Sequence, residues 1–354
     1  KFIVNDDGSL GSRNGVNTAS IETKMGIKGS PTCVLNFDNA IGYLIGPENK
    51  GLNSMFTMMN LERIVVGIQG LGISETAYQN ALSYSKERKQ GVANNSKNKE
   101  ADLIIKHADI RRSLMNMKAL IEGQRSLAFW VSQQIDVGLN HSDKKVKDSA
   151  NDLVSLMTPV IKSFFTDMGM EITNDAIQVF GGYGYTKDQG IEQLFRDNRI
   201  TPIYEGTNSI QAIDLVYRKI LNNKIFDKYI SQINAEIKET AKNKNLSLFS
   251  GKLEKYIELL VNFTSWLKKK HSSSKDDVSS ACNDYLRVFG YVSLGYSWLK
   301  ILRISHEKLK TNKDFFEGKI NTATYYFDKI LPRIQSHYIS AISGSETMMK
   351  ANLN

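Results

Sequence analysis

The chain has 354 residues, 41% of them hydrophobic, which is enough for two or three domains with cores of their own. The net charge is +9, but the lysines gather with asparagine and serine, as in NNSKNKE and KKKHSSSKDD, which indicates solvated loops and not nucleic acid binding. The two cysteines, Cys33 and Cys282, suggest neither a disulfide framework nor a metal site. No apolar run reaches the roughly 20 residues of a membrane span. We therefore expect a soluble, cytoplasmic protein without a bound metal.

The first 52 residues predict a small β segment. Strand-like pieces such as KFIV, PTCVLNF and AIGYLIG alternate with glycine-rich turns. The chain opens with Lys1, directly in strand-like sequence, so we expect that an N-terminal part of the protein precedes it.

From Leu52 onward, apolar residues recur at helical spacing, and the remainder of the chain is predicted to be helical. The polar connectors QGVANNSKNKE and NHSDKKVKDS separate the first three helices, and the second of these is expected to begin near Ala101. Thr158 followed by Pro159 predicts the N-cap and the first residue of a helix that ends at Gly181.

The next helix is predicted to begin with Asn208 as its N-cap, because Gln211 follows three residues later at the spacing of a capping box. After residue 222, the pattern predicts helices at residues 224–241, 251–270, 278–307 and 316–342. Aromatic residues recur at helical spacing in this region, which indicates a core or a subunit interface and not a second site.

Glu205 stands between Tyr204 and Gly206, immediately before the helix expected at residue 208. Taken alone, a carboxylate at this place is explained by its attraction to the helix dipole, worth roughly a few tenths of a kcal/mol. Upstream, the stretch IQVFGGYGYTKD (residues 177–188) sets glycines among aromatic residues, and such a turn can pass close to a phosphate or a planar ring. A solvated acid and a proton acceptor are both compatible with the local sequence of Glu205.

Several motifs, taken together and in order, resemble the acyl-CoA dehydrogenase family over residues 1–222. They are KMGIKGSPT, LERIVVGIQGLG, SKERKQG, QVFGGYGYTKD and RDNRITPIYEGTNSIQ. Further on, YLRVFGYVSLGYSWLK and FFEGKINTATYYFDKILP resemble the extra helical domain of the enlarged members typified by 3-methylmercaptopropionyl-CoA dehydrogenase. The resemblance implies a mostly α fold: a remnant of the middle β domain at 1–52, a four-helix bundle at 53–222 and an additional helical domain at 223–354.

The resemblance also assigns roles around Glu205. In the family, the glutamate of the YEGT motif removes the α-proton of an acyl-CoA thioester, and its backbone N–H, with a flavin ribityl hydroxyl, polarises the thioester carbonyl. Such a base needs an apolar and nearly dry position, and Tyr204 and Gly206 are expected beside the substrate. Arg63 resembles the arginine that meets the CoA portion, while its helical neighbour Asn60 stands where the family often has aspartate.

The same resemblance implies that FAD is the cofactor. Arg88 would bind the pyrophosphate, because a guanidinium offers a planar pair of donors. Contacts from a neighbouring subunit to the adenosine are expected from Gln178, Gly181 and Gly182, and contacts beside the flavin of the same subunit from Thr207 and Asn208. Cofactor sharing implies a homodimer or homotetramer. The family's strand residues that bind the flavin ring lie in the part that is expected to precede this chain.

The expected reaction is α,β-dehydrogenation of an acyl-CoA, with the β-hydrogen leaving as hydride to flavin N5 and electrons passing to electron-transfer flavoprotein. The C-terminal resemblance favours 3-(methylthio)propanoyl-CoA, which would give methylthioacryloyl-CoA. Ordinary short- or medium-chain acyl-CoA substrates and an acyl-CoA oxidase activity are the enzyme alternatives. A DNA-binding relative that acts in alkylation response is the alternative from another class, and a C-terminal region that serves only subunit assembly is a further possibility.

Overall fold

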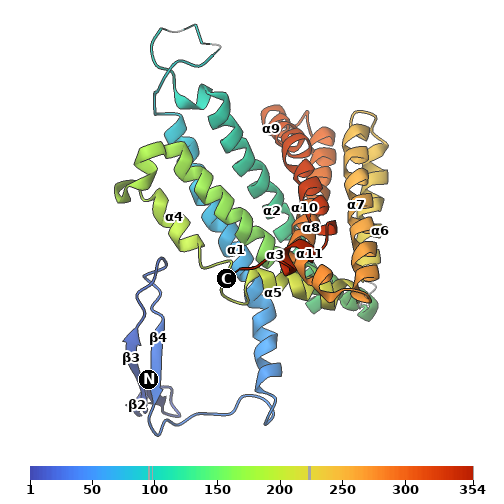
Figure 1. Ribbon diagram of the computed structural model, residues 1–354. Helices are drawn as coiled ribbons and strands as arrows, with labels where there is room; N and C mark the ends of the chain where they lie inside the picture. The colour runs from blue at the N-terminus through green and yellow to red at the C-terminus, as the bar shows by residue number, and fades with distance from the viewer. Residues whose placement is uncertain (95, 98, 222–224, 354) are drawn as a thin grey trace. The chain divides into compact units, whose positions relative to one another are not determined.

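The computed structural model describes residues 1–94, 96–97, 99–221 and 225–353 (Figure 1). The chain divides into two compact units, Lys1–Glu62 and Arg63–Asn354. Helix α1 (Gly51–Ser85) begins in the first unit and continues into the second. The expected fold class, a mostly α chain with a β remnant and further C-terminal helices, is confirmed.

The first unit contains two antiparallel strand pairs. Strand β1 (Phe2–Val4) pairs with β2 (Leu10–Arg13), and β3 (Val16–Ile21) pairs with β4 (Cys33–Phe37). The piece AIGYLIG was expected to be strand-like, but it forms no strand in the structure. Its last glycine has φ +87°, a left-handed conformation that ends an extended run.

The second unit begins with three long helices that pack side by side (Figure 1): the continuation of α1, α2 (Ala108–Asn140) and α3 (Lys144–Phe180). Glycines allow α1 to approach α3 closely. A Cβ atom at Gly67 would lie 2.5 Å from Cγ2 of Ile161, and one at Gly70 would lie 3.2 Å from Cα of Thr166. The segment that carries Glu205 contacts both helices: Tyr204 bonds to Gln69 of α1, and Asn208 bonds to Lys162 of α3.

Two expected helix starts differ from the structure. Helix α2 begins at Ala108 and not near Ala101, because a short 3₁₀ turn, η1 (Ile104–Lys106), precedes it. Thr158 and Pro159 lie inside α3, which already begins at Lys144 after the N-cap Asp143. The predicted N-cap at Thr158 is therefore wrong: its hydroxyl donates to the Val154 carbonyl within the helix, at 2.7 Å.

The end of α3 at Gly181 is confirmed, because this glycine has φ +62° and caps the helix. Between α3 and the Glu205 turn lie two short 3₁₀ helices, η2 (Gly181–Tyr185) and η3 (Lys187–Gln189), and helix α4 (Ile191–Asn198). Helix α5 (Asn208–Ile213) then continues as the π-helix η4 (Asp214–Ile220). The N-cap of α5 is Thr207, whose hydroxyl accepts the Ile210 N–H, so the expected cap at Asn208 is one residue too late.

The C-terminal helices largely follow the expected pattern. They are α6 (Ile225–Ala241), α7 (Ser247–His271), α8 (Lys275–Glu307), α9 (Lys313–Tyr325), α10 (Ile334–Ile342) and α11 (Glu346–Met349). Residue 224, where the first of them was expected to begin, lies outside the described residues. The single helix expected at 316–342 is wrong, because the π-helix η5 (Tyr326–Ile330) and the 3₁₀ turn η6 (Leu331–Arg333), which contains Pro332, interrupt it.

Helix α8 is the central element of the C-terminal region, and it also packs against the bundle. Its Trp298 indole donates to the Ala119 carbonyl of α2 at 3.1 Å, and its Tyr291 meets Phe164 of α3 edge-on, with ring centroids 4.9 Å apart. The C-terminal helices and the bundle thus share one hydrophobic core. The domain boundaries at 52/53 and 222/223 remain predictions. Among the described residues, no helix has both the length and the apolar character to cross a bilayer.

Candidate functional site

Glu205 lies in a tight turn between α4 and α5 that has an uncommon backbone conformation. Its φ is +58°, and Gly206 follows with φ +85°. Left-handed conformations cost free energy for residues other than glycine, and they are found most often where a function requires them. The turn is closed by the Asn208 N–H, which donates to the Pro202 carbonyl at 3.0 Å. The strained but hydrogen-bonded backbone of this turn therefore fixes the direction of the Glu205 side chain.

The Glu205 carboxylate is incompletely satisfied. Its Oε2 atom is buried and has no hydrogen-bond partner in the part of the chain that the structure describes. Within the described residues, the Glu205 N–H likewise donates to no protein group. Buried polar groups are nearly always paired in folded proteins, so the buried, unpaired Oε2 atom calls for a ligand or a reaction to explain it. The carbonyl of Glu205, by contrast, accepts Nε2 of the buried Gln211 at 3.2 Å.

Tyr204 is held by helix α1. Its hydroxyl donates to Oε1 of Gln69, one of the polar side chains brought close by the α1–α3 packing. Arg63, six residues earlier on the same helix, has a buried Nε that finds no hydrogen-bond partner among the described residues. Of the residues predicted to bind substrate, Tyr204 and Gly206 flank Glu205 in the turn, and Arg63 lies on the helix that holds Tyr204.

Lys162 of helix α3 is fully buried, and nothing in the motifs singled it out. The pKa of its amine is lowered to about 8, chiefly by burial; the charge of Asp167 opposes this shift, that of Arg63 adds to it and that of Glu205 opposes it. Its Nζ donates to Oδ1 of Asn208 at 2.9 Å. The Lys162 amine is therefore close enough to both Arg63 and Glu205 for their charges to affect its pKa.

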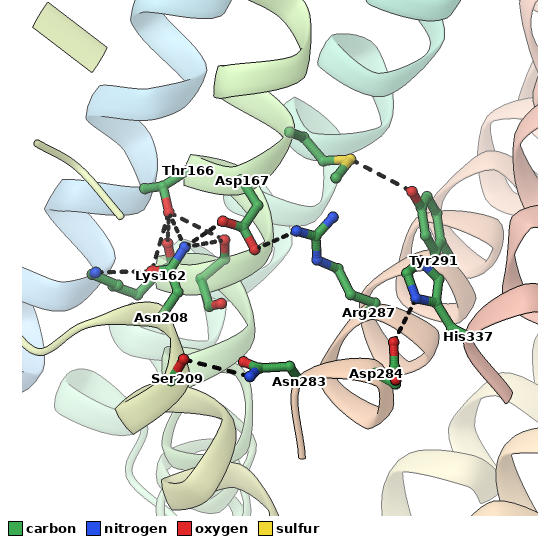
Figure 2. A network of polar contacts seen from close by, with 12 residues as sticks. Lys162, Thr166, Asp167, Asn208, Ser209, Asn283, Asp284, Arg287, Tyr291 and His337 are labelled. Carbon is green, nitrogen blue, oxygen red and sulfur yellow. Dashed lines mark hydrogen bonds and ion pairs between the residues drawn. The ribbon is translucent and has the colours of Figure 1, made fainter. Parts of the chain in front are cut away.

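Asn208 is the centre of a polar network that Figure 2 shows. Besides Lys162, its amide group contacts the Ser163 carbonyl at 3.2 Å, Oγ1 of Thr166 at 3.0 Å and Oδ1 of Asp167 at 2.7 Å. All of these partners belong to α3. This explains why Asn208 does not cap α5: its side chain is committed to tertiary contacts, and the neighbouring Thr207 serves as the cap.

A second group of predicted residues lines one cavity of about 740 Å³. It contains Arg88, Gln178, Gly181 and Gly182, all of which were expected to contact FAD. The guanidinium carbon of Arg88 lies 5.7 Å from the centre of the Tyr183 ring, and no carboxylate pairs with Arg88 among the described residues. Its charge is thus available to an anion.

The walls of this cavity suit the adenosine and pyrophosphate parts of FAD. Tyr84 and Phe180 are stacked with ring centroids 4.2 Å apart, which provides a flat apolar surface for a planar base. At Gly181 and Gly182 no atom lies within 4 Å of an added Cβ, so a ligand can approach the backbone. The size lies within the usual range of ligand pockets, roughly 300–1,000 Å³. These residues fit the cofactor.

The cavity and the Glu205 turn occupy different places along helix α3. Asn208 contacts α3 at Lys162, whereas Gln178 is near the end of that helix, about 24 Å further along the helix axis at about 1.5 Å per residue. The structure therefore does not bring Arg88 together with Thr207 and Asn208. This separation agrees with the expectation that one subunit serves two FAD molecules, and that expectation stays a prediction. Asn60 belongs to the first unit, so its role also stays a prediction.

Gln211 was expected in a capping box, but its side chain donates to the Glu205 carbonyl instead. Sequence reasoning missed the other residues that support the site, namely Gln69, Lys162 and Asp167. For Lys162 a signal exists: the run TPVIKSFF puts a lysine inside an apolar stretch, where a charge requires a partner. For the others, no local pattern marks a residue whose partner lies far away in the sequence.

The chain belongs to the acyl-CoA dehydrogenase family. Residues 49–221 match the family described as acyl-CoA dehydrogenase, C-terminal domain. Residues 233–352 match the family described as acetyl-CoA dehydrogenase C-terminal like. The family resemblance inferred from the motifs is thereby confirmed, including its continuation into the C-terminal helices.

Two curated relatives are similar over nearly the whole chain. The 3-methylmercaptopropionyl-CoA dehydrogenase of Ruegeria pomeroyi is 32% identical over 363 residues, which cover 100% of this chain and 61% of the relative. A butyryl-CoA dehydrogenase of Syntrophomonas wolfei is 32% identical and covers 99% of this chain, with 59% of the relative covered. The chain thus spans about three fifths of the length of these relatives.

The fold is similar to that of an acyl-CoA dehydrogenase from Bacillus anthracis whose crystal structure is a complex with FAD. The TM-score is 0.75 at 20% identity, and the match covers 95% of this chain and 58% of the other. At this identity the likeness concerns the fold.

Proposed function

We propose that the full-length protein is an FAD-dependent acyl-CoA dehydrogenase in which Glu205 is the base. The observation that carries the proposal is the buried and unpaired Oε2 of Glu205, held in a turn with positive φ at the position of the family's glutamate. Membership of the family and the names of the curated relatives support it further.

The residues of this chain would act on the α-carbon and the carbonyl of the thioester. The free Oε2 of Glu205 accepts the α-proton, and because it has no competing donor it can receive that proton directly. The Glu205 N–H, which has no acceptor among the described residues, donates to the thioester oxygen and stabilises the negative charge that develops there. Both groups belong to one residue, so the turn geometry fixes their relative orientation.

Each subunit would contact two FAD molecules: one at the cavity residues Arg88, Gln178, Gly181 and Gly182, and another, on its flavin side, at Thr207 and Asn208. When bound, FAD supplies the two-electron oxidation by accepting the β-hydrogen as hydride. Arg88 would neutralise the pyrophosphate, and the glycine turn would admit the nucleotide to backbone contact. We further propose a homo-oligomer, and electron-transfer flavoprotein as the electron acceptor.

The substrate is proposed to be 3-(methylthio)propanoyl-CoA, which would be converted to methylthioacryloyl-CoA. The relative from Ruegeria pomeroyi, which aligns with the whole chain, supports this choice. A short linear acyl-CoA such as butanoyl-CoA is the second candidate, because the butyryl-CoA dehydrogenase relative is 32% identical as well. Arg63, with its buried unpaired Nε, is proposed to contact the CoA portion that both substrates share.

The test uses the full-length holoprotein without oxygen. Loss of the visible absorbance of oxidised flavin is recorded after addition of 3-(methylthio)propanoyl-CoA and, separately, of butanoyl-CoA. We expect bleaching by the wild type and none by Glu205→Gln, which keeps the size of the side chain and should retain FAD. The faster thioester identifies the substrate class. Undiminished bleaching in Glu205→Gln would mean that another residue is the base, and no bleaching by either thioester would contradict the proposed activity.

Admission of air to the bleached enzyme then separates the enzyme alternatives. A dehydrogenase is expected to stay reduced until electron-transfer flavoprotein is added. Fast recovery of the flavin absorbance in air alone would indicate an acyl-CoA oxidase.

A further inference from the structure

Helix α8 of the C-terminal region reaches the segment that carries Glu205. Arg287 of α8 forms an ion pair with Asp167 of α3, with 2.9 Å between Nη2 and Oδ2. One helical turn earlier, Nδ2 of Asn283 lies 3.4 Å from Oγ of Ser209, four residues after Glu205. Figure 2 shows both contacts. Because Asn283 and Arg287 are four residues apart, they lie on one face of α8, and this face is directed toward the Glu205 segment.

The two oxygens of Asp167 divide their partners between α8 and the turn. Oδ2 forms the ion pair with Arg287, and Oδ1 accepts a hydrogen bond from Nδ2 of Asn208 at 2.7 Å. The carboxylate therefore joins a side chain of α8 to a residue three positions after Glu205. Charge-assisted hydrogen bonds of this kind are shorter and roughly twice as strong as neutral ones.

Asn208 in turn holds the Glu205 turn in place through both its backbone and its side chain. Its backbone N–H closes the turn onto Pro202, and its side chain is held by Asp167 and by the buried amine of Lys162. A shift of Asn208 would move the chain on one side of Glu205 while Pro202 holds the other side. The positive φ of Glu205 leaves few alternative backbone conformations that keep its carboxylate at the same place.

Helix α8 is a rigid base for these contacts. Gly290, one turn after Arg287, lies against Phe164 of α3, and a Cβ atom there would overlap the Phe164 ring. Tyr291 packs edge-on against the same ring, and its hydroxyl points to the sulfur of Met168 at 3.8 Å. Helices α3 and α8 are thus locked together just beside the Arg287–Asp167 pair, so the position of Arg287 is well determined relative to Asp167.

We infer that Arg287 is a positioning residue for Glu205, acting through Asp167 and Asn208. This inference rests on the proposed function, and it gives the C-terminal helices a role in the reaction beyond subunit assembly. Arg287 touches no reacting atom. It holds Asp167 in the orientation that fixes Asn208, and Asn208 holds the turn in which the Glu205 carboxylate and N–H face the thioester.

The test compares Arg287→Gln with Arg303→Gln in the full-length holoprotein. Arg303 is a matched control because it lies on the same helix and is equally buried, with 28% of its side chain exposed against 31% for Arg287. Its partners are Glu236 of α6, at 2.8 Å, and Glu307 of α8, at 3.2 Å, and neither forms a hydrogen bond or ion pair with the Glu205 turn among the described residues. Arg287→Gln removes one ion pair of α8 and Arg303→Gln removes two, so the control should cost folding at least as much as the test substitution.

We expect Arg287→Gln to lower kcat by about tenfold or more, since small displacements of a catalytic group have large effects on rate, while KM changes little. Arg303→Gln should leave kcat unchanged. Arg287→Lys should recover part of the loss, because it restores the charge but not the planar guanidinium. If Arg287→Gln and Arg303→Gln have equal kcat values, Arg287 has only a structural role and the inference is overturned.

Hydrogen–deuterium exchange provides a readout that does not depend on turnover. Peptides that cover residues 199–215 should exchange faster in Arg287→Gln than in the wild type and in Arg303→Gln. Unchanged exchange would overturn the inference even for an active enzyme. An inactive wild type with faster exchange in Arg287→Gln would instead contradict the proposed function and leave the positioning contact established.

Discussion

Nζ of Lys162 donates a hydrogen bond to Oδ1 of Asn208 across 2.9 Å, and this pair joins helix α3 to the turn that carries Glu205. The lysine is fully buried, and its stem is surrounded by the α3 core. An amine in such a place is stable only with partners, and the structure provides an amide oxygen and the nearby carboxylates of Asp167 and Glu205.

The first prediction concerns the pH dependence of stability. The pKa of Lys162 is lowered by burial from its ordinary 10.5 to about 8, with Arg63 adding to the shift and Asp167 and Glu205 opposing it. Between pH 8 and 10.5 the unfolded chain binds more protons at this site than the folded one, so the free energy of unfolding should rise with pH. The rise attributable to Lys162 is at most about 3 kcal/mol.

Lys162→Met removes this titration and keeps an apolar stem. The denaturant midpoints of wild type and variant, measured at several values across that pH range, should therefore diverge, with the wild type gaining stability relative to the variant as pH rises. A constant difference would show that the amine does not release its proton in this range.

Much of the fold could be predicted because helices that cover a core repeat their apolar residues every three to four positions. The ends of these helices were harder. Thr158 and Pro159 carry a helix-start signal, but Leu153, Leu156 and Met157 are buried upstream, and their packing continues α3 through the proline. Tertiary burial outweighs a local signal here.

The candidate site was predicted through its motif residues and not through its supporting contacts. Asn208 was placed at a helix start, within one residue of its observed position, yet its side chain binds residues of α3 more than forty positions earlier, including Ser163 and Thr166. The Arg287–Asp167 pair spans a still longer distance in sequence. Spacing patterns report on neighbours along one element, so contacts of this kind appear only when the helices are assembled.

The second prediction is that Gly206→Ala impairs both stability and catalysis. Gly206 has φ +85°, and an added Cβ would lie 2.7 Å from Nε2 of Gln211, the group that donates to the Glu205 carbonyl. The strained backbone should cost roughly 1–3 kcal/mol. Since Gln211 must also move, the Glu205 turn should shift, and kcat should fall.

Gly251→Ala is the control for this substitution. Gly251 lies in helix α7, has no atom within 4 Å of an added Cβ and has no positive φ. Alanine there should be neutral or stabilise the protein by about 0.4–1 kcal/mol. Thermal midpoints and kcat of the two variants provide the comparison, and an active, fully stable Gly206→Ala variant would contradict the strained turn.

The third prediction separates cofactor binding from substrate binding. Arg88 is the guanidinium without a carboxylate partner in the cavity lined by Gln178, Gly181 and Gly182, so Arg88→Gln should weaken FAD binding. Loss of a hydrogen bond to a charged group costs about 1.5–3 kcal/mol, which corresponds to at least about tenfold in the dissociation constant. The remaining FAD-loaded fraction should keep its KM for the thioester, because Glu205 lies at a different place along α3.

The full-length apoprotein is titrated with FAD, and binding is monitored by flavin fluorescence. The kinetics of each variant are then measured at saturating FAD. Arg112→Gln is the control, since this exposed arginine is paired with Asp109 on α2 and does not line that cavity. It should bind FAD like the wild type. If Arg88→Gln also binds FAD normally, the cavity does not hold the pyrophosphate; if it loses thioester affinity instead, the cavity serves the substrate.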